Sequence, residues 1–161
     1  MGTQPSTIEL SDLESESGGG FVINGVDVND NSGYSVSAAG DVNGDGLDDV
    51  IIGAYQADPN GSNSGSSYVV FGTESTTPIE LSTLEAAGGG GFVINGVGAN
   101  DKSGYSVSAA GDVNGDGLDD VIIGAYQADP NNTNAGASYV VYGTTATTAI
   151  ELSTLEAEGG G

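Results

Sequence analysis

The chain contains no cysteine and no histidine, and its 161 residues include a single basic side chain, Lys102. The absence of cysteine excludes thiol catalysis and disulfide bonds, and the absence of histidine excludes imidazole acid–base chemistry. The 23 acidic residues give a formal net charge of −22. Nothing here could neutralise the phosphates of a nucleic acid, and docking on an anionic membrane is disfavoured for the same reason.

Long apolar runs are also missing, so insertion into a membrane is not expected. Residues 1–20 lack the basic start and apolar centre of a signal peptide. A secreted origin stays open, because Met1-Gly2 could be the start of an excised segment. Tryptophan is absent as well, whereas glycine occurs 29 times between short β-branched runs. This composition is typical of many short strands joined by turns.

The sequence repeats itself with an offset of 71 residues. When Phe21–Gly90 is aligned with Phe92–Gly161, 58 of the 70 pairs are identical. Ile8–Ser11 also matches Ile79–Ser82, as a partial third copy. The chain therefore divides into a linker with an outer-strand segment (1–20), a first repeat (21–91) and a second repeat (92–161).

Each repeat predicts four short strands. In the first repeat Tyr34–Ala39 alternates apolar and small polar residues, and Val50–Ala54 is a continuous apolar run that predicts a strand covered on both faces. Tyr68–Phe71 is the third strand, and the fourth is either Ile79–Leu84 or Phe92–Val97. Ile79–Ala87 could instead form one helical turn. The glycine runs Gly18–Gly20 and Gly88–Gly91 are expected to be flexible connections.

A four-stranded sheet repeated at a fixed period is typical of a β-propeller blade. The rungs of a β-solenoid are usually much shorter than this repeat. The predicted fold class is therefore all-β, with two propeller blades of four-stranded antiparallel sheet in the chain.

The ten residues that follow the first strand, Gly40–Asp49, recur unchanged as Gly111–Asp120. They place oxygen-bearing side chains at alternate positions around a glycine turn, which is how a short loop surrounds a hard cation such as Ca²⁺. Position twelve, where an EF-hand has its glutamate, is an isoleucine within an apolar run, so the loop joins two strands. The alternative is an ordinary acidic turn, in which three carboxylates repel one another without benefit.

Spacing predicts the same ligand positions in both loops, with leucine contributing its backbone carbonyl. The remaining acidic residues, Asp48 and Asp119, fall out of phase and are expected to face solvent. The predicted ligands of two Ca²⁺ ions per chain are Asp41, Asn43, Asp45, Leu47 and Asp49, and Asp112, Asn114, Asp116, Leu118 and Asp120.

These motifs, taken in order, resemble the FG-GAP repeat of integrin α-subunit propellers and of bacterial extracellular proteins. The first repeat carries the resemblance at Gly33–Val36, Gly40–Gly46, Ile51–Ala54 and Tyr68–Gly72, and the second at Gly104–Val107, Gly111–Gly117, Ile122–Ala125 and Tyr139–Gly143. Two departures are visible in each repeat: Tyr34 and Tyr105 replace an aromatic-glycine opening, and Tyr55 and Tyr126 stand where proline is common. The resemblance implies the same metal ligands and a closed ring, commonly of seven blades.

Two repeats cannot close such a ring. The chain is therefore either a fragment of a larger array or a homo-oligomer joined head to tail. Three chains would give six blades and four would give eight. The segment that precedes the first complete repeat, residues 8–26, is a candidate for the strand that fastens one copy to the next.

Three functional hypotheses remain open. The first is a calcium-stabilised structural or adhesion module without catalytic activity, at the surface of a bacterial cell or outside it, which presents its loops to a protein or glycan. The candidate contact residues are Asp58, Asn60 and Asn63 with their second-repeat counterparts Asp129, Asn131 and Asn134, although the sequence favours solvated turn residues at these positions. The second is an excised or engineered pair of blades that assembles into a propeller. The third is a propeller hydrolase that uses paired carboxylates with Tyr55 or Tyr126.

Overall fold

The computed structural model describes residues 10–15, 19–85, 90–130 and 133–159. Three residues of the predicted glycine connections, Gly18, Gly88 and Gly89, lie outside these ranges, as does Asn131. In chain order the elements are the 3₁₀ helix η1 (Leu10–Ser15), the strands β1 (Ile23–Asn24), β2 (Ser35–Gly40), β3 (Asp49–Ala54), β4 (Ser66–Val70) and β5 (Ile79–Glu80), the helix α1 (Leu81–Glu85), the strands β6 (Gly91–Asn95), β7 (Ser103–Gly111), β8 (Asp120–Ala125), β9 (Ala137–Val141) and β10 (Ile150–Glu151), and the helix α2 (Leu152–Gly159).

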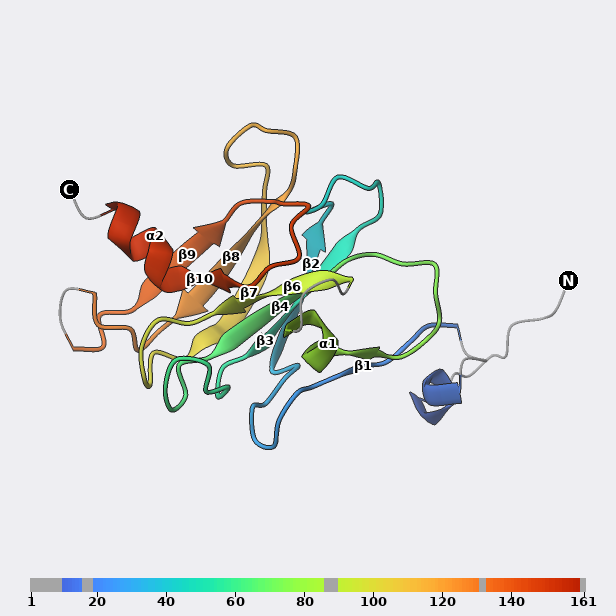
Figure 1. Cartoon of the computed structure of the whole chain (residues 1–161), viewed down its shortest axis with the longest axis horizontal. Coiled ribbons are helices and arrows are strands. Elements are labelled where there is room, and N and C mark those ends of the chain that lie inside the picture. The colour runs from blue at the N-terminus through green and yellow to red at the C-terminus, as the bar shows by residue number, and fades with distance from the viewer. Residues whose placement is uncertain (1–9, 16–18, 86–89, 131–132, 160–161) are drawn as a thin grey trace, which may run out of the picture.

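The prediction of an all-β fold built from propeller-type blades is confirmed. The first three predicted strands of each repeat form an antiparallel meander, β2-β3-β4 in the first and β7-β8-β9 in the second. Their bounds fall within one or two residues of the predicted strands. The two sheets lie side by side, with β1 and β5 at one end of the molecule and β9 and α2 at the other (Figure 1). Two blades leave the ring open.

The fourth strand of the first blade is β6, which pairs antiparallel with β4. This resolves the ambiguity between the two candidates in favour of the segment around Phe92. The other candidate divides: Ile79–Glu80 forms strand β5, and the chain then turns into helix α1. Strand β10 adds to the outer edge of β6 in parallel, giving the five-stranded order β10-β6-β4-β3-β2. The first blade is thus completed by strands from the second repeat.

The main hydrophobic core lies between the two blades. Val42 and Ile51 of the first blade pack in one buried cluster with Val107 and Val121 of the second. The blades also approach through backbone atoms, because a Cβ added at Gly53 would lie 2.0 Å from the carbonyl oxygen of Gly104. Glycine is therefore required at position 53 for the blades to pack this closely.

A second cluster lies beneath helix α1. Leu81 and Leu84 of this helix are buried against Ile52, Tyr68 and Val93 of the first blade, with Ile23 and Ile79 at its margin. A helix of five residues has little stability of its own. Burial of its two leucines against the sheet is what holds it in place.

A row of four tyrosines links the blades. Tyr34 and Tyr55 of the first blade lie 4.7 Å apart between ring centroids, Tyr105 of the second blade lies 5.1 Å from Tyr34, and Tyr126 continues the row 4.5 Å from Tyr105. The hydroxyl of Tyr34 donates to the hydroxyl of Tyr105 over 3.1 Å. These are the four positions at which the sequence departs from the FG-GAP pattern, and the structure brings them together.

Candidate metal centre

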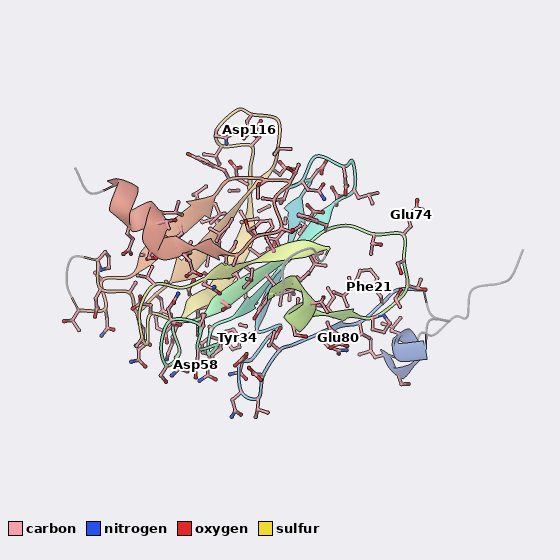
Figure 2. The ribbon with its side chains drawn as sticks, in the orientation of Figure 1. Phe21, Tyr34, Asp58, Glu74, Glu80 and Asp116 are labelled. Atoms are coloured by element: carbon pink, nitrogen blue, oxygen red, sulfur yellow. The ribbon has the colours of Figure 1, made fainter. Side chains whose placement is uncertain are left out.

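The two acidic loops connect the first and second strands of their blades. In the first loop Gly44 and Gly46 have φ values of 77° and 89°, in the left-handed region that side chains disfavour. The matching glycines of the second loop, Gly115 and Gly117, have φ values of 78° and 93°. Each loop therefore turns at the glycines the spacing predicts, and Figure 2 shows Asp116 out on the second loop, away from the sheets.

The carboxylate of Asp41 is the hub of the first loop. Its Oδ1 accepts hydrogen bonds from the backbone N–H groups of Gly44 (2.8 Å) and Asp45 (3.0 Å), and its Oδ2 accepts one from Gly46 (3.0 Å). The loop is thus wound around one carboxylate. Charge-assisted bonds of this kind are stronger than neutral ones, so they favour this conformation.

The next two predicted ligands are bonded within the same loop. Asn43 Oδ1 accepts from the N–H of Asp45 over 2.8 Å, and Asp45 Oδ1 accepts from the N–H of Leu47 over 2.9 Å. Asn43 Nδ2 also donates to Asp45 Oδ2 over 2.9 Å. The side-chain oxygens of positions one, three and five therefore gather over the same short stretch of backbone.

Asp49 lies beneath the loop and is 1% exposed. Its Oδ2 accepts from Val42 N and its Oδ1 from Gly72 N, each over 2.8 Å. This side chain therefore fastens both the start of the loop and the end of β4. Burial raises the pKa of Asp49 most, the two backbone hydrogen bonds lower it, and the charges of Asp45 and Asp41 raise it further.

The second loop reproduces this arrangement. Asp112 accepts from the backbone N–H groups of Gly115 (2.7 Å), Asp116 (3.0 Å) and Gly117 (3.0 Å). Asn114 Oδ1 accepts from Asp116 N over 2.9 Å, and Asp116 Oδ1 accepts from Leu118 N over 2.9 Å. Buried Asp120 accepts from Val113 N and Gly143 N, each over 2.8 Å.

The donor set of each loop is made of oxygen atoms from carboxylates, an amide and a carbonyl, which suits Ca²⁺. Across the described residues, however, no three acidic side chains converge closely enough to form a ready-made metal cage. The loop carboxylates have no basic side chain beside them in that part of the chain, because the Nζ of Lys102 donates to the hydroxyl of Tyr126 over 3.2 Å. The oxygen donors of the two loops are therefore chemically suited to Ca²⁺, and no basic side chain balances the negative charge of the loop carboxylates.

The expectation that Asp48 and Asp119 both face solvent is right for Asp48 and wrong for Asp119. Asp48 is exposed, whereas Asp119 is half-buried and its Oδ2 accepts from the N–H of Asp41 over 2.9 Å. Gly40 has a φ of 77°, and a Cβ there would lie 2.1 Å from this oxygen, so glycine is favoured at this position. Asp119 thus joins the two acidic loops. The spacing of residues in the sequence did not predict this contact, and the repeated Asp-Asp pair is its only trace there.

The loop residues considered for partner binding make turn contacts. Asn63 has a φ of 52°, and its N–H donates to Asp58 Oδ1 over 2.6 Å. The N–H of Asn60 donates to Ser64 Oγ over 3.1 Å within the same loop, and Asn60 Nδ2 donates to the carbonyl oxygen of Gly96, outside the loop, over 2.8 Å. The N–H of Asn134 donates to Asp129, as in the first repeat. These contacts account for the residues as turn formers that hold the longest loops.

The family model described as FG-GAP repeat matches the chain twice, at residues 32–70 and 103–141. The chain is also similar to integrin alpha pat-2 of Caenorhabditis elegans, with 38% identity over 97 residues that cover 60% of this chain and 7% of that protein. Integrin alpha-PS2 of Drosophila melanogaster is 31% identical over 128 residues, which cover 76% of this chain and 8% of that protein. The chain thus spans less than a tenth of the length of these relatives. No helix of the described residues is long and apolar enough to cross a bilayer.

Proposed function

Because the chain is built from two FG-GAP repeats, we propose that it is a calcium-stabilised, non-catalytic module of an adhesion-type β-propeller, with one Ca²⁺ in each acidic loop. The ion would be held by the predicted oxygen donors from Asp41 to Asp49 and from Asp112 to Asp120. It would supply the positive charge that the loops lack.

One observation carries this proposal. In each loop the side-chain oxygens of positions one, three and five lie over a single turn of backbone, and the carboxylates among them have no basic side chain to balance their charge. A bound cation would supply the compensating charge. We expect a dissociation constant on the order of 10⁻⁴ M, as in extracellular calcium modules.

The stabilisation follows from mass action. With free Ca²⁺ about tenfold above the dissociation constant, each site would stabilise the fold by about 1.4 kcal/mol, and two sites by roughly 3 kcal/mol. That is a substantial share of the stability of a domain of ordinary size. The ion would act structurally, by fixing the turn between the first two strands of each blade.

Calcium titration followed by calorimetry tests the proposal. We expect two Ca²⁺ per chain and a melting temperature that rises with calcium and falls on addition of chelator. Asp112→Asn removes one ligand charge and should reduce the stoichiometry to one. Glu74→Gln removes the same charge from an exposed position in the loop after β4 and should leave both sites intact. Absence of heat and of a melting shift in the unaltered chain would refute calcium binding.

The similarity to integrin alpha chains supports adhesion as the role of the module. We place it outside the cell, in contact with a protein or glycan, and a bacterial cell surface stays our prediction for its origin. Binding of the calcium-loaded chain to an extracellular-matrix protein array and a glycan array, each repeated in chelator, is the direct measurement. Absence of binding to both arrays would count against adhesion, and it would leave the proposal of calcium sites unaffected.

High identity between the repeats also supports the alternative of an excised or engineered pair of blades, which would assemble without any ligand. For a hydrolase, the candidate tyrosines Tyr55 and Tyr126 are packed in the tyrosine row between the blades. Turnover above the blank in a screen of glycoside and phosphoester substrates would support a hydrolase.

A further inference from the structure

We propose that the outer edge of β9 receives strand β1 of a second copy of this chain, so that copies join head to tail. The added strand would complete the second blade in the way that β6 completes the first. This inference rests on the repeat and on strand pairing, and it holds whether or not the acidic loops bind calcium.

The acceptor is an open sheet edge. In the first blade the outer edge of β4 is covered by β6, in a register that pairs Val69 with Phe92 and Ser67 with Ile94. Strand β9 has the same sequence as β4 except for one serine-to-alanine change, yet in the described part of the chain its outer edge carries no strand. Such an edge presents a row of free backbone donors and acceptors.

The donor is already arranged as an outer strand. Phe21–Asn24 is identical to Phe92–Asn95, which contains most of β6. β1 pairs in parallel with β5 at Ile23↔Ile79, as β6 pairs with β10 at Ile94↔Ile150, and the two registers differ by the repeat offset. The sheet β1-β5 is therefore the outer pair of a blade whose inner three strands are missing.

Backbone direction in β1 fits this role. The N–H of Ile79 donates to the carbonyl oxygen of Val22 over 2.9 Å, so the main-chain groups of Val22 and Asn24 face β5. Alternation along a strand then turns those of Phe21 and Ile23 to the opposite, unpaired edge. The corresponding residues of β6, Phe92 and Ile94, are paired with β4. In the proposed register Phe21 would pair with Val140, and Ile23 with Ser138.

A groove of about 680 Å³ runs beside β9. Its lining includes apolar and aromatic side chains from β9, from the turn after it, from β10 and from α2, among them Val140, Tyr142, Ile150 and Leu155. In the first blade the corresponding space contains β6 and is part of the core. The groove therefore has the place and the lining of an outer strand's binding site.

Exposure of matched residues shows the same open surface. Val140 is 37% exposed and Leu155 is 36%, whereas their first-repeat counterparts Val69 and Leu84 are 0% and 1% exposed. For the first strand of the blades the first repeat is the exposed one, because Val36 of β2 is 65% exposed and its second-repeat counterpart Val107 of β7 is 9% exposed. The two open surfaces are thus the two halves of the interface that already joins the blades within the chain.

The polar contacts that join the two blades within the chain can also form between two copies. The N–H groups of Asn100 and Ser103 donate to the carbonyl oxygens of Ser62 and Ser64 over 2.8 and 3.0 Å. Displaced by one repeat, Asn29 and Ser32 of one copy would donate to Thr133 and Ala135 of the next. In the same way exposed Asp48 would accept from the N–H of Asp112, as Asp119 accepts from Asp41 within the chain.

A single chain cannot make this contact with itself. β1, with Phe21 beside it, lies at one end of the molecule, and β9 and α2 lie at the other (Figures 1 and 2). An interface that uses two different surfaces builds a closed ring or a filament. Three copies would close a six-bladed ring and four an eight-bladed ring.

A designed disulfide tests the register. Asn24 and Ala137 should face each other between copies, because their counterparts Asn95 and Ser66 are paired with side chains 3.3 Å apart. The chain has no cysteine, so Asn24→Cys with Ala137→Cys has no competing thiols. After oxidation, a denaturing gel should show a ladder that ends at the ring size. The control pair, Asn24→Cys with Val140→Cys, is three residues out of register and should cross-link far less.

Blocking the edge tests the association itself. Val140→Lys puts a charge where the next copy's strand would pack, and we expect it to weaken association by about tenfold or more in light scattering. Thr76→Lys adds the same charge at an exposed turn and should not change the mass. A monomer at every concentration, or equal cross-linking by both cysteine pairs, would overturn the proposal and assign the edge to another strand, such as a following repeat of a longer chain.

Discussion

At the residue scale, the acidic loops depend on which oxygen each backbone N–H finds. The contacts made by Asp41, Asn43 and Asp45 span two to five residues, so the spacing in the sequence was sufficient to predict that these side chains gather. The contact of Asp119 spans 78 residues and joins two blades. No local pattern contains it, because it depends on how the sheets pack.

Asp48 and Asp119, which occupy equivalent positions in the two repeats, should therefore respond differently to replacement by alanine. Asp119→Ala leaves the N–H of Asp41 without its acceptor, and we expect a loss of about 1–3 kcal/mol in the free energy of unfolding. Asp48→Ala changes an exposed side chain and should alter the stability of the dilute chain by less than about 0.5 kcal/mol. Urea unfolding in chelator gives both values. Equal effects would show that the contact of Asp119 contributes little.

At the scale of the elements, predicted and observed strands agree where the sequence shows a single hydrophobic pattern. β2 and β3 form where alternation and an unbroken apolar run predict them. The segment Ile79–Leu84 could not be decided, because its apolar residues suit both a strand and one helical turn, and the structure uses both in succession. The choice of β6 as the fourth strand is made by packing against β4, and sequence pattern gives no information on that.

Helices α1 and α2 have the same sequence over their first five residues but different surroundings, which makes them a matched pair. Leu84→Ala removes a side chain buried against the first blade, and we expect a loss of about 2–5 kcal/mol. Leu155→Ala alters a partly exposed side chain beside the open groove, so the loss in the dilute chain should be closer to 1 kcal/mol.

Denaturant unfolding of both leucine variants at low chain concentration is the measurement. At high concentration the cost of Leu155→Ala should grow toward that of Leu84→Ala, because a second copy would bury this leucine. A cost that stays the same at all concentrations would mean that the groove remains open, and would separate the packing of α2 from assembly.

At the scale of the whole molecule, the two blades lie side by side, and each blade leaves exposed a surface whose counterpart in the other blade is buried. Val42 is buried by the second blade, whereas its counterpart Val113 is 59% exposed, since no further blade covers it in the described chain. The sequence predicted the repeat and therefore the need for neighbours. It could not give the register of a strand between copies, which follows from the observed pairing of β6 with β4 and of β1 with β5.

Charge acts on the whole molecule too, since the chain has a formal net charge of −22. Asp30 and Asp101 accept backbone hydrogen bonds from Asp27 and Gly98, but burial raises the pKa of both carboxyl groups above 3.8. The folded chain therefore binds protons more tightly than the unfolded chain at these positions. Their ionised forms cost stability at neutral pH, and this cost disappears as the pH falls through the raised pKa values toward 3.8.

We therefore expect the calcium-free chain to melt at a higher temperature near pH 4.5 than at pH 7, and added NaCl at pH 7 to raise the melting temperature by screening repulsion. Thermal melting in chelator at constant ionic strength measures the first effect. Asp101→Asn should flatten the pH dependence, because amide and carboxyl differ little once the acid is protonated. Saturating Ca²⁺ should oppose the trend, since protons compete with the metal for the loop carboxylates. A calcium-free chain that loses stability steadily from pH 7 to 4.5 would show that hydrogen bonds to ionised carboxylates outweigh burial and repulsion across the molecule.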